Sequence, residues 1–369
     1  MNTNAKVFSL GLDMLRSWAL LLCFVTIPAF SQTVIGPGKV SGTWTAQNSP
    51  YIIQGFISVE ENQTLVIKPG TVVKFDSYSL RVDEGESLVA EGTPDSMIIF
   101  TSNKANPAPG DWGAIQGGIM LDDLGDKAVL KYCIVEYATS GIACFASAYG
   151  CTGHSNRARI ENCILRFNKD HGIYCLGSGG STGCIPSKTG NSSPHIESNW
   201  IYENGGAGIF LVAWDGDYAN GYIGAEIFRN VISNNQGYGI QCYGDDPVQP
   251  KIANNTIANN VAGGIRFLDN FDPKHFLIRN NIIADNGIGL HSVNAAIPTH
   301  QYNDLWSNST DYQGLTTAVG DTSADPLFVN ANARDFHLQS LSPCIDAGDP
   351  VSPKDPDSTI ADMGAFYFH

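Results

Sequence analysis

The feature that most constrains this chain is an irregular internal repeat, in which isoleucine, asparagine and glycine return at fixed places. The aligned segments read IENCILRFNKDHGIYC, IESNWIYENGGAGIFL, IFRNVISNNQGYGIQC, IANNTIANNVAGGIRF and IRNNIIADNGIGL, and they start at Ile160, Ile196, Ile227, Ile252 and Ile278. Self-similarity at periods of about 20–50 residues is typical of solenoids and other repeat arrays. We therefore interpret the repeat before any single motif.

The spacing of the repeat predicts coils built from short strands. Successive isoleucines are 36, 31, 25 and 26 residues apart, and the variation falls after a Gly-Ile pair that closes each of the first four segments. Insertions that collect at one corner are typical of a solenoid. Each unit contains short apolar runs of period two and no helical period, so we expect several strands per coil. Successive coils should stack as parallel sheets about 4.8 Å apart.

The paired asparagines of KIANNTIANNVAGGIRF, residues 251–267, are predicted to be structural. Asparagine tolerates the left-handed turn conformation, and its amide carries both a donor and an acceptor. Amides stacked at the coil spacing can bond to one another in a ladder. One column of the alignment contains Cys163, Asn199, Asn230, Asn255 and Asn281, and another contains Asn168, Asn204, Asn235, Asn260 and Asn286. These residues are therefore not expected to be catalytic.

With these ladder columns, residues 129–308 resemble the right-handed parallel β-helix proteins of the pectin-lyase-like group. Three segments resemble the opening coils of secreted bacterial members: TLVIKPGTVVKF at 64–75, LVAEGTPDSMIIFTS and GDWGAI. Two further segments resemble the C-terminal closing segment of these proteins: DPLFVNANARDFHLQSLSPCIDAGDP and DMGAFYF. The resemblance implies an all-β parallel β-helix with terminal caps. The expected divisions are a signal peptide at 1–31, a cap and first coils at 32–128, regular coils at 129–315 and a closing segment at 316–369.

The N-terminus and the charge indicate an exported protein that does not bind nucleic acid. An apolar stretch from Trp18 to Ile27 follows Lys6 and Arg16, and Ala29-Phe30-Ser31 offers a cleavage site, which we place after Ser31. No later segment approaches the roughly 20 apolar residues of a membrane helix. The formal net charge of −15 makes nucleic acid an improbable partner.

The patterns of catalytic β-helix enzymes match this sequence poorly. DHGIYCLGSGG at 170–180 is similar to the Gly-His-Gly segment of polygalacturonases, with His171 as its histidine. The coil before it has Thr139 and Ser140 where an aspartate pair is required. Glycoside hydrolysis needs two carboxyl groups, so His171 is interpreted as a turn residue.

Outward positions of the Gly-Ile strand form a second candidate surface. When isoleucine points inward, the next residue points outward, which gives the row Ala143, Tyr174, Phe210, Gln241 and Arg266. An aromatic-lined groove that stacks sugar rings would use Tyr174, Phe210, Trp214, Tyr218 and Tyr243. The alternative is a satellite core, in which loops fold back over Tyr174 and Phe210.

Eight cysteines follow the predicted cleavage site, and exported proteins commonly form disulfides. Stacked, parallel side chains suit the geometry of a disulfide poorly, and three repeat cysteines share an inward column: Cys144, Cys175 and Cys242. Cys151 and Cys184 lie in consecutive insertions, so we predict a Cys151–Cys184 bridge. Local Cys144–Cys151 and Cys175–Cys184 links are the alternative.

Acidic residues after three consecutive Gly-Ile strands suggest a calcium site. The pairs are Asp215 and Asp217, Asp245 and Asp246, and Asp269 and Asp272. Stacked loops could bring their carboxylates to one ion, because calcium accepts six to eight oxygens with loose geometry. In a lyase, the ion would neutralise a uronate while Arg266 or Lys274 took the proton alpha to the carboxylate. The alternative is that these aspartates are solvated turn residues.

Three functions follow from these observations. The first is a secreted or surface β-helix that binds an extracellular polysaccharide without catalysis, and the absence of a matching catalytic motif favours it. The second is a calcium-assisted polysaccharide lyase, and the third is a glycoside hydrolase. The sequence does not decide the glycan or the oligomeric state.

Overall fold

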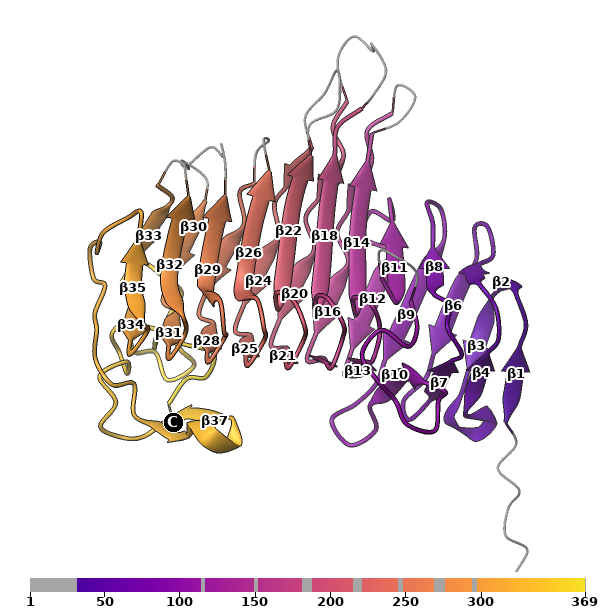
Figure 1. Cartoon of the computed structure of the whole chain (residues 1–369), viewed down its shortest axis with the longest axis horizontal. Coiled ribbons are helices and arrows are strands. Elements are labelled where there is room, and N and C mark those ends of the chain that lie inside the picture. The colour runs from indigo at the N-terminus through magenta and orange to yellow at the C-terminus, as the bar shows by residue number, and fades with distance from the viewer. Residues whose placement is uncertain are drawn as a thin grey trace, which may run out of the picture. The chain divides into compact units, whose positions relative to one another are not determined.

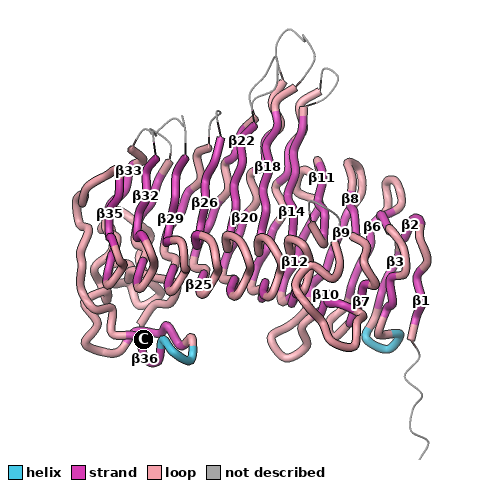
Figure 2. Tube along the Cα trace, viewed as in Figure 1, coloured by secondary structure: helices cyan, strands magenta, loops and turns pink. Residues whose placement is uncertain are grey.

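The structure is a computed structural model of the chain. It describes residues 32–113, 117–148, 152–180, 188–214, 221–244, 248–268, 276–293 and 297–368, which belong to one compact unit. The described residues form a right-handed parallel β-helix, as predicted (Figure 1). Short strands wind through three parallel sheets and are joined by turns and loops, with two short helical segments near the two ends of the described chain (Figure 2). Among the described residues, no helix has the length and hydropathy of a membrane span.

The three long sheets are named A, B and C in the order in which each coil visits them. Sheet A contains β1 (Thr33–Ile35), β4 (Tyr51–Ile53), β7 (Val72–Phe75), β10 (Ile98–Ser102), β13 (Cys133–Glu136), β17 (Ile164–Arg166), β21 (Trp200–Tyr202), β25 (Val231–Ser233), β28 (Thr256–Ala258), β31 (Ile282–Ala284) and β34 (Asp304–Trp306). Sheet B contains β2 (Gly38–Val40), β5 (Ile57–Val59), β8 (Leu80–Val82), β11 (Ile119–Asp122), β14 (Ile142–Ser147), β18 (Ile173–Ser178), β22 (Ile209–Trp214), β26 (Tyr238–Gly244), β29 (Gly263–Leu268), β32 (Ile288–Val293) and β35 (Thr310–Gln313).

Sheet C and the minor elements complete the described fold. Sheet C contains β3 (Gly42–Trp44), β6 (Thr64–Ile67), β9 (Ser87–Glu91), β12 (Ala128–Lys131), β16 (Arg159–Glu161), β20 (His195–Glu197), β24 (Glu226–Phe228), β27 (Lys251–Ala253), β30 (Leu277–Arg279) and β33 (Thr299–Gln301). A small sheet contains β15 (Ser155–Asn156), β19 (Asn191–Ser192) and β23 (Tyr222–Ile223), and β36 (Phe328–Asn330) pairs with β37 (Asp335–Leu338). The single-turn 3-10 helices are η1 (Ala46–Asn48) and η2 (Ala331–Ala333).

Inward side chains of the three sheets form one continuous core. In register, Ile201 lies beside Ile232 and Ile232 beside Ile257, and all three are fully buried. The isoleucines that define the repeat form a second such column in sheet C, where Ile196, Ile227, Ile252 and Ile278 pair in order. Burying apolar surface contributes about 25 cal/mol per Å², so these columns supply much of the stability.

Two asparagine ladders run along the core, as the alignment predicted. One contains Asn199, Asn230, Asn255, Asn281 and Asn303, and the other contains Asn168, Asn204, Asn235, Asn260, Asn286 and Asn308. Each Nδ2 donates to the Oδ1 of the next coil at 2.9–3.0 Å. Each Oδ1 also accepts the preceding coil's backbone N–H, as Asn255 does from Asn230 at 2.9 Å. The amides therefore satisfy buried turn groups that the sheets leave unpaired.

The two asparagines of each pair have different roles. Asn255 and Asn260 belong to the ladders, whereas Asn254 and Asn259 have left-handed backbones with φ of 53° and 58°. Other coils place Ser198 at the same left-handed turn position, with φ of 57°. The turn therefore tolerates several residue types, whereas the ladder position is an asparagine from Asn199 to Asn303 in one column and from Asn168 to Asn308 in the other.

Each ladder ends on an aspartate at the C-terminal end of the solenoid. Nδ2 of Asn308 donates to Asp311 at 2.9 Å, and Nδ2 of Asn303 donates to Asp321 at 3.2 Å. Burial alone would raise the pKa of Asp321, but hydrogen bonds from His300 and backbone N–H groups outweigh it and lower that pKa. The last amide donor of the second of these ladder ends thus meets a carboxyl group, that of Asp321, whose ionised form is favoured.

The C-terminal segment lies along the outer face of sheet A. Phe336 and Ala365 pack on Val231 and Ala258, and Leu338, Cys344 and Met363 pack on Ile282 and Ala284. The backbone is tied down where Ala365 N donates to Thr256 Oγ1 at 3.0 Å. Figure 1 shows this segment folded back beside the turns near β28 and β31.

The repeat cysteines are stacked thiols, as their columns predicted. Cys144 pairs in register with Cys175, and both are buried and free, so the two alternative disulfides are not formed. Cys133, Cys163, Cys242 and Cys344 are also buried and free. Cys151 and Cys184 lie outside the described residues, so their bridge stays a prediction.

Candidate functional site

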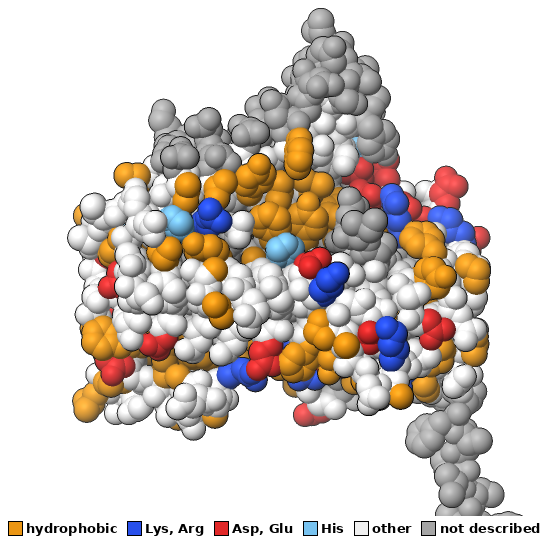
Figure 3. Space-filling view, in the orientation of Figure 1, with side chains coloured by type: hydrophobic (Ala, Val, Ile, Leu, Met, Phe, Trp, Pro, Cys, Tyr) orange, Lys and Arg blue, Asp and Glu red, His pale blue; other side chains and the backbone are white. Residues whose placement is uncertain are grey.

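The outer face of sheet B carries the row of side chains that the sequence predicted. Ala143, Tyr174, Phe210, Gln241 and Arg266 are register partners on five successive strands. A second outward row lies two residues further along each strand and is also apolar. The apolar members of the two rows, together with Trp214 two residues beyond Val212, form what we call the apolar strip: Met120, Phe145, Tyr174, Leu176, Phe210, Val212, Trp214, Tyr243 and Leu268. Figure 3 shows hydrophobic side chains gathered over β14, β18 and β22.

The aromatic rings of the strip contact one another across coils. Tyr174 stacks on Phe210 with centroids 5.7 Å apart and an interplanar angle of 17°, and it meets Phe145 edge to face at 5.4 Å. Met120 and Phe145 are 7% and 5% exposed, whereas Trp214 is 61% exposed. The strip is therefore covered at its N-terminal end and open at Trp214. The packing of Tyr174 against Met120 and Phe145 agrees in part with the satellite core, and sugar stacking by these aromatics stays a prediction.

His171 borders the strip from the turn before β18, where a turn residue was predicted. Its ring lies 4.6 Å from that of Phe210, and its Nδ1 accepts the backbone N–H of Ala207 at 3.0 Å. Nδ1 therefore carries no proton, and the neutral ring has its proton on Nε2. Burial lowers the pKa of His171, which keeps the ring neutral at pH 7. A Cβ on Gly206 would lie 2.8 Å from Nδ1, so glycine is needed there.

A cation lies at the C-terminal end of the strip. Arg266 stands between Gln241 and His291 in the outward row, and its guanidinium carbon lies 5.5 Å from the Tyr238 ring centroid. The Tyr238 hydroxyl lies 2.7 Å from Nδ1 of His291. Nε of Arg266 is buried without a hydrogen-bond partner, and within the described ranges no carboxylate forms an ion pair with it. Burial, and secondarily the charge of Arg266, lowers the pKa of His291.

Carboxylates lie at the opposite end, over β8 and β11. Asp122 pairs with Arg81 at 2.9 Å, and burial raises the pKa of Asp122. Burial also raises the pKa of the neighbouring Asp123 to about 6. Between the two ends the strip crosses five interstrand steps, or about 24 Å at the usual strand spacing.

Many predicted site residues lie outside the described residues. These are Lys274, Tyr218, and the aspartates Asp215, Asp217, Asp245, Asp246, Asp269 and Asp272. The strands before the three acidic pairs, β22, β26 and β29, are neighbours in sheet B and end at the same edge, as the metal prediction assumed. Among the described side chains, no group of three His, Cys, Asp or Glu could hold a metal ion.

Sequence reasoning missed part of the second outward row and the two residues that accompany Arg266. The second outward row, with Phe145, Leu176 and Val212, follows from the same alternation that gave the first row. Tyr238 and His291 carried no signal, because they come from different coils and meet only through the register of β26, β29 and β32.

Similar solved structures include two enzymes that act on polysaccharides. A mutant of the periplasmic alginate epimerase AlgG is 15% identical over 83% of this chain and 69% of its own, with a TM-score of 0.48. The pectate lyase Pel9A is 14% identical over 85% of this chain and 88% of its own, with a TM-score of 0.38. The comparison with curated proteins found no match.

Two family models match the solenoid. The model of a pectate-lyase like beta helix domain matches residues 38–150. The model described as periplasmic copper-binding protein (NosD) matches residues 96–314, which is more than half of the chain. The chain therefore belongs to the NosD family of β-helix proteins.

Proposed function

We propose that this protein is exported and binds an extracellular polysaccharide along the apolar strip. The observation that carries the proposal is the in-register row of Tyr174 and Phe210, with the 61% exposed Trp214 at its open edge. Flat aromatic faces at successive coils suit a chain of sugar rings, and an apolar surface bordered by polar groups is typical of a binding groove.

The two ends of the strip would give the bound chain a direction. Asp122 lies at one end and Arg266 at the other. A carboxylate-bearing sugar would be placed at the arginine end, because Arg266 has no ionic partner among the described residues. Acidic polysaccharides such as pectate, alginate and glycosaminoglycans are therefore the first probes.

The proposal is tested by titrating defined polysaccharides into the protein in a calorimeter. Trp214→Ala should weaken binding about tenfold, because losing one exposed aromatic contact costs on the order of 1.4 kcal/mol. Phe56→Ala is the matched control, since Phe56 is also an exposed aromatic, at 43%, but lies among the first coils. Equal affinities for both variants, or no heat with any acidic or neutral polysaccharide, would reject the proposal.

A calcium-assisted polysaccharide lyase is the second candidate, and Arg266 favours it, because no described carboxylate forms an ion pair with this residue. In a lyase this guanidinium would hold the uronate carboxylate or take the alpha proton, beside the Tyr238–His291 hydrogen bond. Calcium would be held by the six aspartates that follow β22, β26 and β29. No described residue supports the glycoside hydrolase alternative to the same degree.

Absorbance of unsaturated products separates lyase from binder. The screen uses pectate, alginate and glycosaminoglycans, with calcium or with a chelator, on the parent and on Arg266→Lys. A lyase should give product that is lost in the variant and in chelator. Calcium should also raise the melting temperature of chelator-treated protein, because a ligand that binds only the folded state stabilises it. No product and no shift at millimolar calcium would remove this candidate.

The copper in the family's description does not fit the described residues. Copper prefers thiolate, thioether and imidazole ligands, yet among these residues no group of three His, Cys, Asp or Glu is arranged so that it could hold a metal ion. The stacked thiols of Cys144 and Cys175 lie in the core, and burial raises the pKa of Cys175 well above its ordinary value. A thiolate, the form that would bind copper, is therefore disfavoured at Cys175.

Export is part of the proposal and has its own test. It is supported by the apolar stretch at Trp18 to Ile27 and by the periplasmic description of the family. Protein recovered from outside the cytoplasm should begin at Gln32. An intact Met1 in that fraction would contradict the predicted cleavage.

A further inference from the structure

A hollow lies where the C-terminal segment meets the turns between sheets C and A. Ala365 of this segment packs on Val231, and the ring of the next residue, Phe366, contacts that of Trp200 in β21. Between these residues and the turns of the coils remains a cavity of about 380 Å³. Cavities of about 300–1,000 Å³ are typical of small-molecule sites. Because β21 and β25 belong to sheet A, this hollow lies on a different face from the apolar strip.

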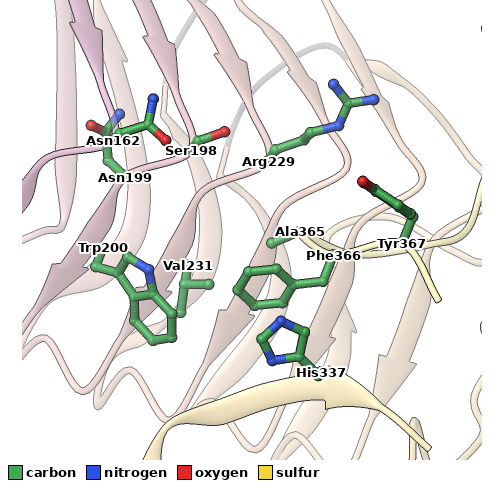
Figure 4. A pocket seen from close by; sticks show the side chains of 10 residues that line it. All are labelled: Asn162, Ser198, Asn199, Trp200, Arg229, Val231, His337, Ala365, Phe366 and Tyr367. Atoms are coloured by element: carbon green, nitrogen blue, oxygen red, sulfur yellow. The ribbon is translucent and has the colours of Figure 1, made fainter. Parts of the chain in front are cut away.

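Aromatic rings form one side of the hollow. Trp200 and Phe366 have centroids 5.9 Å apart and are tilted by 42°, and His337 stacks on Phe366 at 4.1 Å and 22°. Figure 4 shows Trp200, Phe366 and His337 along one side of the space. The rings are braced from behind, since the segment that carries Phe366 is fixed by the hydrogen bond from Ala365 to Thr256.

Polar side chains with spare hydrogen-bonding capacity form the opposite side. Asn162 and Ser198 occupy left-handed turn positions of adjacent coils, with φ of 53° and 57°, and line the hollow with Arg229 (Figure 4). Within the described residues, neither the Asn162 amide nor the Ser198 hydroxyl has a hydrogen-bond partner. Among the described residues, the guanidinium of Arg229 makes one hydrogen bond, a long one of 3.5 Å to Glu197, and its charge also acts on Asp355. An amide, a hydroxyl and a guanidinium therefore remain available to a ligand.

We propose that this hollow binds one neutral pyranose residue. One face of the sugar ring would stack on Trp200 and Phe366, as flat apolar surfaces do. Its hydroxyl groups would exchange hydrogen bonds with Asn162, Ser198 and Arg229, which supply both donors and acceptors. A neutral sugar is favoured over an acidic one, because Glu197 already faces Arg229 and its carboxylate would repel an anion.

The proposed site is independent of the apolar strip, and one experiment reports on both. In protein labelled with 5-fluorotryptophan, the fluorine resonance of Trp200 is assigned with Trp200→Phe and that of Trp214 with Trp214→Phe. Methyl glycosides of glucose, galactose, mannose and N-acetylglucosamine are then added singly to the full chain. We expect at least one of them to shift the Trp200 resonance in a saturable way while the Trp214 resonance stays in place.

Variants test the polar side of the hollow. Ser198→Ala should raise the Kd of the active glycoside at least threefold and leave the melting temperature unchanged, because the Ser198 hydroxyl has no described partner to lose. Trp214→Ala should leave that Kd unchanged. The proposal is overturned if none of the glycosides moves the Trp200 resonance at tens of millimolar. It is also overturned if a phenylalanine-containing peptide, added as a separate probe, is the only compound that moves this resonance.

Discussion

Replacing Asn235 with alanine tests whether the amide ladders hold the coils together. Asn235 and Asn234 are adjacent residues of one type with different surroundings. Asn235 is fully buried, and its Oδ1 accepts the backbone N–H of Asn204 at 3.1 Å and the Nδ2 of Asn204 at 2.9 Å. Asn234 has a left-handed backbone with φ of 57°, and its backbone N–H donates to the carbonyl oxygen of Ala258 at 3.2 Å.

The expected loss follows from the donors that Asn235→Ala leaves without an acceptor. The backbone N–H of Asn204 and one of its amide hydrogens remain buried, and each such group costs roughly 1–3 kcal/mol. Allowing partial relaxation, the free energy of unfolding should fall by about 2–5 kcal/mol. A unit of about 340 residues has an unfolding entropy near 0.7 kcal/mol/K, so the melting temperature should fall by roughly 3–7 °C.

Differential scanning calorimetry of Asn235→Ala and Asn234→Gly measures the effect. Glycine adopts a left-handed backbone without steric cost, so Asn234→Gly should stay within about 1 kcal/mol of the parent. Circular dichroism of both variants checks that the β-helix is retained. Equal melting temperatures for the two variants would refute the reasoning, because the ladder amide would then be no more important than its half-buried neighbour.

Three further perturbations probe the core and its charges. Ile257→Asp places an unpaired carboxylate in a fully buried column and should cost several kcal/mol; normal export and an unchanged melt would show that Ile257 is not core. Gly239→Ala puts a Cβ 2.4 Å from Cγ2 of Ile257 and should lower the free energy of unfolding by about 1–3 kcal/mol. Urea unfolding measures this loss, with Val261→Ala at an exposed residue as the control. Burial raises the pKa of Asp304 to about 6, so ionisation destabilises the fold as pH rises through 6. The free energy of unfolding of Asp304→Asn should therefore exceed that of the parent by up to about 3 kcal/mol at pH 8 and should equal it at pH 4. Urea unfolding at the two pH values measures the difference, and a difference that does not change with pH would contradict this reasoning.

The repeat made most of the solenoid predictable. Strand alternation and stacking at one spacing are local rules, so the alignment of Ile232 with Ile257 and of Tyr174 with Phe210 followed directly from the sequence. The ladder columns followed for the same reason, including Cys163 at the head of one of them, where its N–H donates to Asn199. Because the strands pair in parallel and in register, equivalent residues of successive coils lie side by side throughout the solenoid.

The docking of the C-terminal segment could not be predicted in the same way. Arg334 contacts Glu203 and lies over the ring of Tyr202, 4.3 Å from its centroid. These partners are more than a hundred residues apart in the chain, and the segment has no repeat that would fix its register. The hollow beside Trp200 depends on this packing, so no pattern within the coils indicates it.

The aspartates that end the two ladders bear on how long such a solenoid can grow. A terminal asparagine would present a free amide N–H, and a further coil or a second chain could use it as a template for the next rung. Asp311 and Asp321 instead accept the last amide and offer no proton in return. Asp321 is also occupied by His300 and Tyr312. Neither ladder can therefore continue by an amide–amide bond into a further coil or a second chain at this end.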